Sequence, residues 1–432
     1  MDGRARRHPT PRRGRGQGVN DNRGVSEPAA RAAMTQTTET AIPRRAIVLL
    51  SMAAFSSSIN IRTCDPLLPA IAQGFAVTVG QASLIITAFA VGYGLTQLVF
   101  GPVGDRYGKY LVVALTCIMA GFASAFSAFM PTLDWLIAAR FVAGGFAASA
   151  IPLAFAWIGD AVPFERRQAV LARFLSAQMM GIVLGQAFGG LIGDLFGWRH
   201  VFLIVGAMHC IAGAAMLLEL RANPSAQPPG ATSTLRLETL AAGYLGLLQR
   251  PWVRVLLIAA FIEAFALYGS FAYVGAYLHH RFGLSFTVVG AVMASYGAGA
   301  ILYSLTARRL IAAIGERGLI IGGGGLMALA YVLLAMAPRV YLVPPIMMLL
   351  GLAFYMLQNT LQTNATQMAP EARGLGMSTF AFALFIGQSF GVALAAPIMD
   401  RFGAPPLFLI SAVILPLVAL WFRSRLSVRP PA

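Results

Sequence analysis

Long apolar runs recur along the whole chain, and they limit how it can fold more than any other feature. A helix that crosses a bilayer needs about 20 mostly apolar residues. Runs of this length are expected near residues 46–66, 82–103, 111–130, 135–158, 172–195, 200–219, 252–278, 287–306, 318–337, 341–366, 375–398 and 405–422. The sequence therefore predicts an all-α membrane protein with twelve transmembrane helices.

The composition excludes a water-soluble globule. Of the 432 residues, 58% are hydrophobic and 11% are charged, whereas an average soluble domain is about 45–50% apolar and about 25% charged. The net charge of +16 does not indicate nucleic-acid binding, because the basic residues lie at the ends of apolar runs and in the first 45 residues. This distribution is typical of a membrane topology signal.

Lys and Arg in the loops orient the helices, since positive loops stay in the cytoplasm. With a cytoplasmic N-terminus, the inside loops and C-terminal tail hold Arg106, Lys109, Arg166, Arg167, Arg173, Arg221, Arg236, Arg250, Arg308, Arg309, Arg317, Arg373, Arg423, Arg425 and Arg429. The outside loops hold Arg199, Arg281, Arg339 and Arg401. This bias of fifteen against four predicts a multi-pass protein of the cell (inner) membrane with both termini cytoplasmic.

The predicted order of segments is a disordered basic tail (1–43), a six-helix bundle (44–219), a cytoplasmic loop (220–250), a second six-helix bundle (251–422) and a cytoplasmic tail (423–432). Two interpretations of the first residues stay open. They form a basic arm near anionic lipid, or translation starts at Met34, which gives a more usual lead into the first span.

The two predicted bundles repeat each other in sequence. Gly-Gln-Ala-Phe-Gly at 185–189 returns as Gly-Gln-Ser-Phe-Gly at 387–391, and Asp-Leu-Phe-Gly at 194–197 returns as Asp-Arg-Phe-Gly at 400–403. Several matches in the same order on equivalent spans indicate duplication. Two such halves with a cytoplasmic link are the plan of a rocking-bundle transporter, whose site lies near the bilayer midplane between the halves.

The loop after the second span reads GPVGDRYGKY at 101–110. It is not a phosphate-binding loop, because the glycine spacing differs, a tyrosine follows the lysine and the flanks are membrane spans. It closely resembles the signature G-x-x-x-D-R-x-G-R/K of the major facilitator superfamily. The resemblance implies a conformational latch that stabilises the outward-open state, formed by Gly101, Asp105, Arg106, Gly108 and Lys109.

Two of the latch residues have a physical reason for their role. Asp105 would cap a helix end and pair with basic groups, and Gly101 would allow close helix packing. The alternative is that these charges only mark an inside loop. The equivalent second-half loop keeps Arg308 and Arg309 but lacks the acid.

Charged residues inside the membrane are costly and therefore functional candidates. Arg140 with Gly144 resembles the family's R-x-x-x-G pattern, which implies proton coupling; the alternative is an interfacial arginine whose head reaches the membrane surface. Asp65 lies three residues after Arg62, so that it can pair with it or bind a proton. Glu263, if buried without a partner, would favour its neutral form, as a proton carrier requires; a buried pair or a lipid-facing position is the alternative. The predicted proton-coupling residues are thus Asp65, Glu263 and Arg140.

Polar residues inside the predicted spans are candidates for substrate binding or for holding helices together. They are Asn60, Arg62, Gln186, Gln358, Asn359, Gln362 and Gln388. Antiporters of the family carry G-x-x-x-G-P-x-x-G-G in the fifth span. Here Gly181, Gly185, Gly189 and Gly190 match, but Gln186 replaces the proline, which weakens the antiporter assignment.

The expected function is secondary active transport, with proton-coupled efflux of small hydrophobic or cationic compounds by alternating access. The alternative is a proton symporter or a sugar or metabolite permease of the same fold. We expect no enzyme activity, no cofactor, no metal site and no nucleic-acid partner. The expected partners are a small-molecule substrate, protons and the lipid bilayer, with the protein as a monomer.

Overall fold

The computed structural model of the protein describes residues 44–226 and 237–429, which form helices joined by short connections and contain no β-strand. The predicted basic tail (1–43), part of the predicted central loop (227–236) and the last three residues lie outside the described residues.

The first half runs from α2 to α10. Its elements are α2 (Arg44–Arg62), η1 (Asp65–Leu67), α3 (Leu68–Phe75), α4 (Val79–Ala82), α5 (Leu84–Tyr107), α6 (Lys109–Ser127), α7 (Leu133–Ala147), α8 (Ala150–Ala161), α9 (Phe164–Phe196), α10 (Trp198–Ala222) and η2 (Pro224–Ala226). The break after α2 follows from the sequence, since Pro66 and Pro69 lack the N–H that a continuous helix would use.

The second half runs from α11 to η5. Its elements are α11 (Leu237–Gln249), α12 (Pro251–Phe271), α13 (Val274–Phe282), α14 (Phe286–Met336), η3 (Val340–Leu342), α15 (Val343–Gln367), η4 (Pro370–Ala372), α16 (Arg373–Phe402), α17 (Ala404–Arg425) and η5 (Leu426–Val428).

Eleven helices of the described ranges are long and apolar enough to cross a membrane, whereas the apolar runs of the sequence predict twelve. The difference arises in α14, a continuous element of 51 residues that contains both predicted spans 287–306 and 318–337. Gly315 has φ 63° and ψ −177° inside it, which is not a helical conformation and is open to glycine at little cost. The two predicted spans therefore meet at a break in one element instead of a loop.

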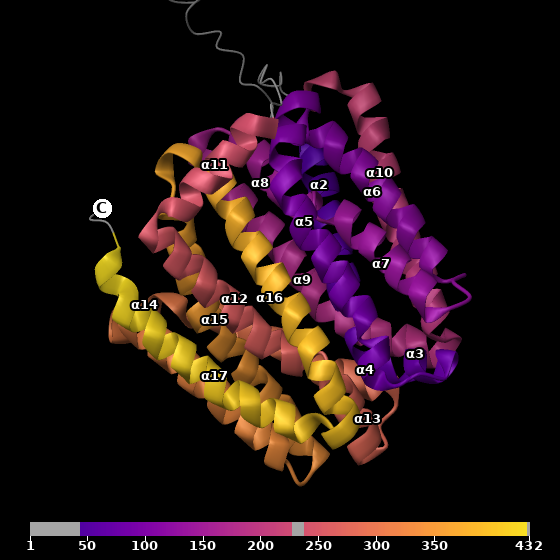
Figure 1. The fold of residues 1–432 in the computed structure, drawn as a ribbon. Helices are drawn as coiled ribbons and strands as arrows, with labels where there is room; N and C mark the ends of the chain where they lie inside the picture. The colour runs from indigo at the N-terminus through magenta and orange to yellow at the C-terminus, as the bar shows by residue number, and fades with distance from the viewer. Residues whose placement is uncertain (1–43, 227–236, 430–432) are drawn as a thin grey trace, which may run out of the picture. The chain divides into compact units, whose positions relative to one another are not determined.

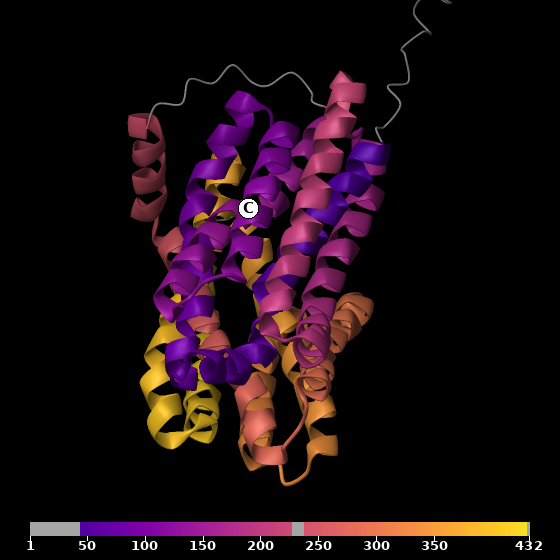
Figure 2. The same cartoon turned by 90° about the vertical axis from the view of Figure 1, so that its right-hand side faces the viewer.

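Helices of the two halves pack along each other in two places. α9 lies against α14, and α5 lies against α16 (Figure 1). We name the two ends of the bundle by the chain: the terminal end is where α2 begins and α17 ends, and the far end is where α9 and α16 end. In Figure 2, α11 lies at the upper, terminal end, and the short helices α3 and α4 lie at the lower, far end.

Glycines permit the closest helix crossings, and the crossings match between the halves. A Cβ at Gly144 of α7 would overlap the Phe89 carbonyl of α5, and a Cβ at Gly351 of α15 would overlap the Tyr296 carbonyl of α14. Gly144 and Gly351 are as many residues apart as Phe89 and Tyr296 are, so the two pairs occupy equivalent positions in the two halves. Close approach of small residues is how helices associate in lipid, so the same packing solution occurs twice.

Candidate functional site

Arg140 lies in the interior of the first half and holds Asn60. The Arg140 side chain is 1% exposed. Its Nη1 donates to Asn60 Oδ1 at 2.6 Å, and its Nη2 donates to the Asn60 carbonyl at 3.2 Å. Asn60 Nδ2 then donates to Ser124 Oγ of α6 at 2.9 Å. The alternative of an interfacial arginine is contradicted by this burial; the guanidinium joins α7 to α2.

Asp65 is fully buried where α2 gives way to η1. Its Oδ2 lies 3.7 Å from Arg62 Nη1, so the predicted pairing of the two residues is confirmed. Among the described residues, neither carboxylate oxygen has a hydrogen-bond partner, although the Gln186 side chain of α9 lies near enough to act on Asp65. A Cβ at Gly275 of α13 would be 2.6 Å from the Asp65 carbonyl. Asp65 thus lies where the first half meets the second.

Arg62 extends from the first half onto aromatic rings of the second. Its guanidinium carbon is 4.1 Å from the centroid of the Tyr268 ring and 5.7 Å from that of Phe271, both on α12. The Tyr296 ring of α14 is 4.9 Å from Phe271, and the Phe354 ring of α15 is 5.8 Å from Tyr268. We call Tyr268, Phe271, Tyr296 and Phe354 the aromatic wall.

Glu263 is also fully buried, and neither of its oxygens has a hydrogen-bond partner among the described residues. On a helix it shares a face with Leu267 and Ser270. The Leu267 carbonyl accepts from Tyr331 Oη of α14 at 2.6 Å, and Ser270 Oγ lies 2.7 Å from Ser411 Oγ of α17. Glu263 therefore faces helices of its own half, although it also lies near enough to Tyr268 to interact with it electrostatically.

The predicted polar residues of α15 differ in their burial and in their partners. Gln358 is buried and its Oε1 has no partner within the described ranges, whereas Gln362, one turn on, is exposed. Asn359 Nδ2 donates to Tyr303 Oη at 3.1 Å. Gln388 of α16 is buried as well, in the position that repeats Gln186. Gln186 lies near Asp65, but the seven predicted polar residues are not all gathered around Asp65.

The predicted latch residues bond within the first half. Lys109 Nζ lies 2.7 Å from Asp105 Oδ1 and 2.7 Å from Asp160 Oδ2 of α8. Arg106 lies over the Tyr107 ring, and Gly108 ends α5 with φ 95°. The expected close packing at Gly101 is wrong, because a Cβ there would meet no atom within 4 Å. Gly104 has that role instead, since its Cβ would be 2.6 Å from Leu153 Cδ2.

Asp194 binds the second half at the far end. Its Oδ1 accepts from the Phe286 N–H at 3.0 Å and its Oδ2 accepts from the Thr287 N–H at 2.6 Å, the first two residues of α14. A carboxylate at a helix N-terminus satisfies unpaired N–H groups and the helix dipole. A Cβ at Gly190 would overlap the Phe286 carbonyl, so the two helices touch there.

Asp400 makes the equivalent contact in the reverse direction. Its Oδ1 accepts from the Gly80 N–H at 2.8 Å and its Oδ2 accepts from Thr78 Oγ1 at 2.7 Å, at the N-terminus of α4. A Cβ at Gly80 would be 2.6 Å from the Ala396 carbonyl of α16. We call these two carboxylate contacts the far-end clasps; each joins one half to a helix N-terminus of the other.

The family follows from the chain as a whole. The profile of the major facilitator superfamily matches residues 50–392 and, in a second match, residues 256–432. The chain belongs to the major facilitator superfamily. Its membership agrees with the apolar helices and with the signature loop at 101–110.

Relatives of this superfamily member are named for different functions. It is 24% identical over 82% of its length to the bicyclomycin resistance protein homolog of Haemophilus influenzae, covering 89% of that protein. It is 26% identical to the 4-hydroxybenzoate transporter PcaK of Pseudomonas aeruginosa, over 41% of this chain and 39% of that protein. The chain is thus a multi-pass membrane transporter of a superfamily that includes drug-resistance and metabolite transporters.

Similarity to a solved structure supports the fold of this chain and carries no information about its function. The bacterial homolog of the human lysosomal transporter Spinster, in an inward-facing and occupied conformation, superposes with a TM-score of 0.71 at 19% identity. The match covers 90% of this chain and 99% of that chain.

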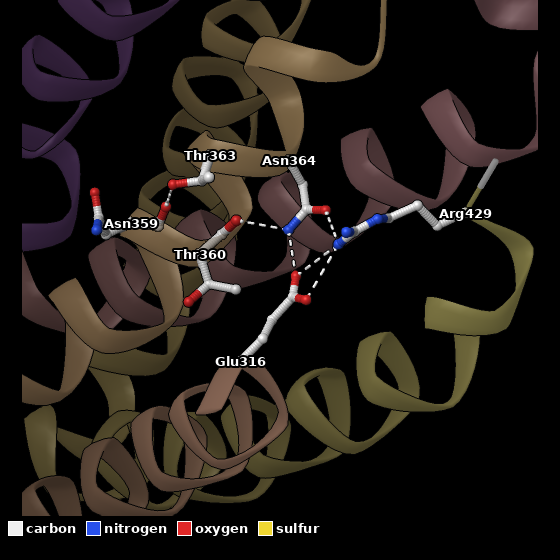
Figure 3. Close-up of polar contacts among 6 residues, drawn as sticks. All are labelled: Glu316, Asn359, Thr360, Thr363, Asn364 and Arg429. Carbon is white, nitrogen blue, oxygen red and sulfur yellow. Dashed lines mark hydrogen bonds and ion pairs between the residues drawn. The ribbon is translucent and has the colours of Figure 1, made fainter. Parts of the chain in front are cut away.

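A polar cluster at the terminal end was missed from the sequence (Figure 3). Glu316, the residue after the Gly315 break, accepts from Asn364 Nδ2 at 2.7 Å and from Arg429 Nη1 at 3.1 and 3.2 Å. Arg429 Nη1 also donates to Asn364 Oδ1 at 3.1 Å. The second half therefore has an acid directly after its break, at the position equivalent to Lys109, which directly follows Gly108 in the first half.

Tyr244 of α11 makes a contact between the halves at the terminal end. Its hydroxyl donates to the Leu98 carbonyl of α5 at 2.7 Å. Burial raises the pKa of this phenol to about 12, so that it keeps its proton and remains a donor at physiological pH. Elsewhere at this end the α5–α16 surfaces are open at their glycines, since a Cβ at Gly101 or Gly374 would meet nothing within 4 Å.

Proposed function

We propose that this superfamily member is a monomeric secondary transporter that exports small, largely hydrophobic compounds in exchange for protons by alternating access. The observation that carries the proposal is Asp65: a fully buried carboxyl without hydrogen-bond donors, at the contact between the halves, next to Arg62 and Gln186. A carboxyl so placed can change its proton occupancy when its surroundings change between two conformations.

The conformation described here corresponds to the inward-open state in this proposal. The excess of Lys and Arg in the terminal-end loops makes that end cytoplasmic. The far-end clasps close the outer side, and the latch residues Asp105 and Lys109 bond within their own half. In the outward-open state the clasps would break and the latch would meet the second half. The break at Gly315 then separates two crossings, which gives twelve helices in two six-helix bundles in the cytoplasmic membrane.

The residues have different roles in this cycle. Asp65 carries the proton, and Arg140 positions α2 through Asn60. Glu263 is the second candidate acid; it would act within the second half, because it faces α14 and α17. Gln186 and Gln358 have unpaired buried amide atoms and are the first substrate-binding candidates, while Asn359, Gln362 and Gln388 remain weaker ones.

A second candidate function is proton-coupled uptake of a sugar or metabolite. Gln186 stands where antiporters of the family carry proline, and one relative is named as a 4-hydroxybenzoate transporter. The relative named for bicyclomycin resistance covers far more of the chain, which favours export.

The test uses inverted membrane vesicles energised by respiration and a pH-sensitive dye. Added lipophilic compounds should release protons from the wild-type vesicles, and Asp65→Asn should abolish the response. Glu263→Gln is measured in parallel. If this variant loses the proton-release response and Asp65→Asn keeps it, the proton is carried by Glu263 on α12. Uptake in right-side-out vesicles without any response in inverted ones would favour the second candidate.

A further inference from the structure

The buried charges around Asp65 sum to a positive value. Arg62 and Arg140 both lie near Asp65 and are 7% and 1% exposed. Glu263 is near Tyr268 but is not among the charges that act on Arg62 or Asp65. One carboxylate against two guanidinium groups leaves one positive charge when Asp65 is ionised and two when it is protonated. A cationic substrate would be repelled in both states, and an anion would be attracted.

Arg62 has hydrogen-bonding capacity that the described residues do not use. Arg140 donates to Asn60 through Nη1 and Nη2, although its Nε has no partner among the described residues, whereas Arg62 contacts Asp65 in an ion pair at 3.7 Å. A guanidinium group carries five N–H donors in a planar fork that matches a carboxylate. The ion pair with Asp65 at 3.7 Å leaves part of this fork able to bind the carboxylate of a ligand.

Other unpaired atoms lie around the same guanidinium. Tyr296 Oη and Gln186 Nε2 are both buried without a partner among the described residues. Tyr296 lies close enough to Arg62 to interact with it electrostatically. The Gln186 side chain lies near the carboxylate of Asp65, beside Arg62. Both can donate a hydrogen bond, as the free lone pairs of a bound carboxylate would require.

The remaining surroundings are aromatic. The rings of Tyr296 and Phe354 are 6.0 Å apart, and Tyr355 follows at 5.1 Å from Phe354. Offset and edge-to-face ring contacts of this spacing stabilise a further aromatic group. A cation would compete with Arg62 for these ring faces, since Arg62 already lies over Tyr268.

We propose that the substrate of this site is an aromatic carboxylate, with its carboxylate on the Arg62 guanidinium and its ring against the aromatic wall. The proposal rests on the transporter function proposed above and deepens it by naming the substrate class. It replaces the hydrophobic or cationic compounds expected from the sequence, because the sequence did not show which way Glu263 faces.

The test measures binding to the purified full-length protein by isothermal titration calorimetry. The probes are 2-naphthoate, 2-naphthamide and 2-naphthylmethylammonium, which share one ring system and differ in charge. We expect 2-naphthoate to bind at least tenfold more tightly than either other probe. Arg62→Gln should remove this preference, and Arg62→Lys, which keeps the charge but not the fork, should reduce it severalfold. Arg199→Gln, an arginine over far-end aromatic rings, is the matched control and should leave it unchanged.

Three results would overturn the proposal: tightest binding of the ammonium probe, equal binding of all three, or no binding of 2-naphthoate to the wild type. Should Arg62→Gln fail to fold, Arg62→Lys decides. None of these results bears on proton-coupled export itself, because the vesicle assay with other lipophilic compounds measures that separately.

Discussion

The far-end clasps make a quantitative prediction about the conformational equilibrium. Asp194 and Asp400 each accept two hydrogen bonds from a helix N-terminus of the other half, at 2.6–3.0 Å and 2.7–2.8 Å. Substituting Asn for either aspartate removes the charge and replaces one acceptor oxygen with a donor. The closed far end should lose stability relative to the open one, since these bonds exist only when the halves meet there.

The magnitude follows from the kind of bond and its exposure. A hydrogen bond to a charged group contributes about 1.5–3 kcal/mol, and a charge at a helix end about 0.3–1 kcal/mol. Both aspartates are exposed, so solvent screening reduces the net contribution to about 1 kcal/mol per clasp. One substitution should then shift the open-to-closed ratio roughly 5-fold, and both together roughly 30-fold.

Cys64 supplies a native reporter for the assay. It is 1% exposed, next to Asp65 and inside the closed far end. In a background with Cys117→Ser and Cys210→Ser, a membrane-impermeant maleimide added outside intact cells should label Cys64 slowly. Labelling should be faster in Asp194→Asn and in Asp400→Asn, and fastest in the double variant.

The matched control is Asp134→Asn, which changes the same charge at the far end on the first turn of α7 without bridging the halves. Its labelling rate should equal that of the background. Unchanged rates in both clasp variants, or an equal rise in the control, would refute the reasoning.

Three further predictions concern stability. Asn60→Ala removes the Oδ1 acceptor of the buried Arg140 Nη1, while the main-chain carbonyl of residue 60 still accepts from Nη2. The substitution should cost about 1–3 kcal/mol, seen as a lower Tm in purified protein; an unchanged Tm would contradict the described bond. Gly351→Val should prevent correct packing and abolish expression of folded protein, whereas Gly101→Ala should be tolerated; size-exclusion profiles compare the two, and equal behaviour would be a contradiction. Arg429→Ala removes an exposed ion pair with Glu316 and should cost about 0–1 kcal/mol, with transport retained; a large loss of transport would show that the terminal-end cluster has a role beyond a surface ion pair.

The sequence predicts the helices because their signal is local. Each apolar run reports its own burial in lipid, and the loop charges report orientation, without knowledge of any partner. The break at Gly315 is different: glycine-rich sequence follows it, and nothing local distinguishes a polar loop from a kink inside one element.

The site is predictable only where its contacts are short in sequence. Arg62 and Asp65 are three residues apart, and their pairing is confirmed. Arg140 and Asn60 are far apart along the chain, so neither motif shows that one holds the other. Glu263 could be identified as a buried acid, but which helices it faces depends on the rotation of α12. The repeated Asp-x-Phe-Gly stretches revealed duplication, yet the role of Asp194 and Asp400 lies in helix ends of the opposite half.

The central claim is that Asp65 couples protons to substrate movement, and one measurement in proteoliposomes tests it most directly. Asp65→Asn is compared with the wild type in substrate transport driven by an imposed pH gradient and in substrate exchange without a gradient. The account predicts that the variant loses gradient-driven transport but retains exchange, because exchange needs the site and not its proton. Gradient-driven transport equal to that of the wild type would contradict it.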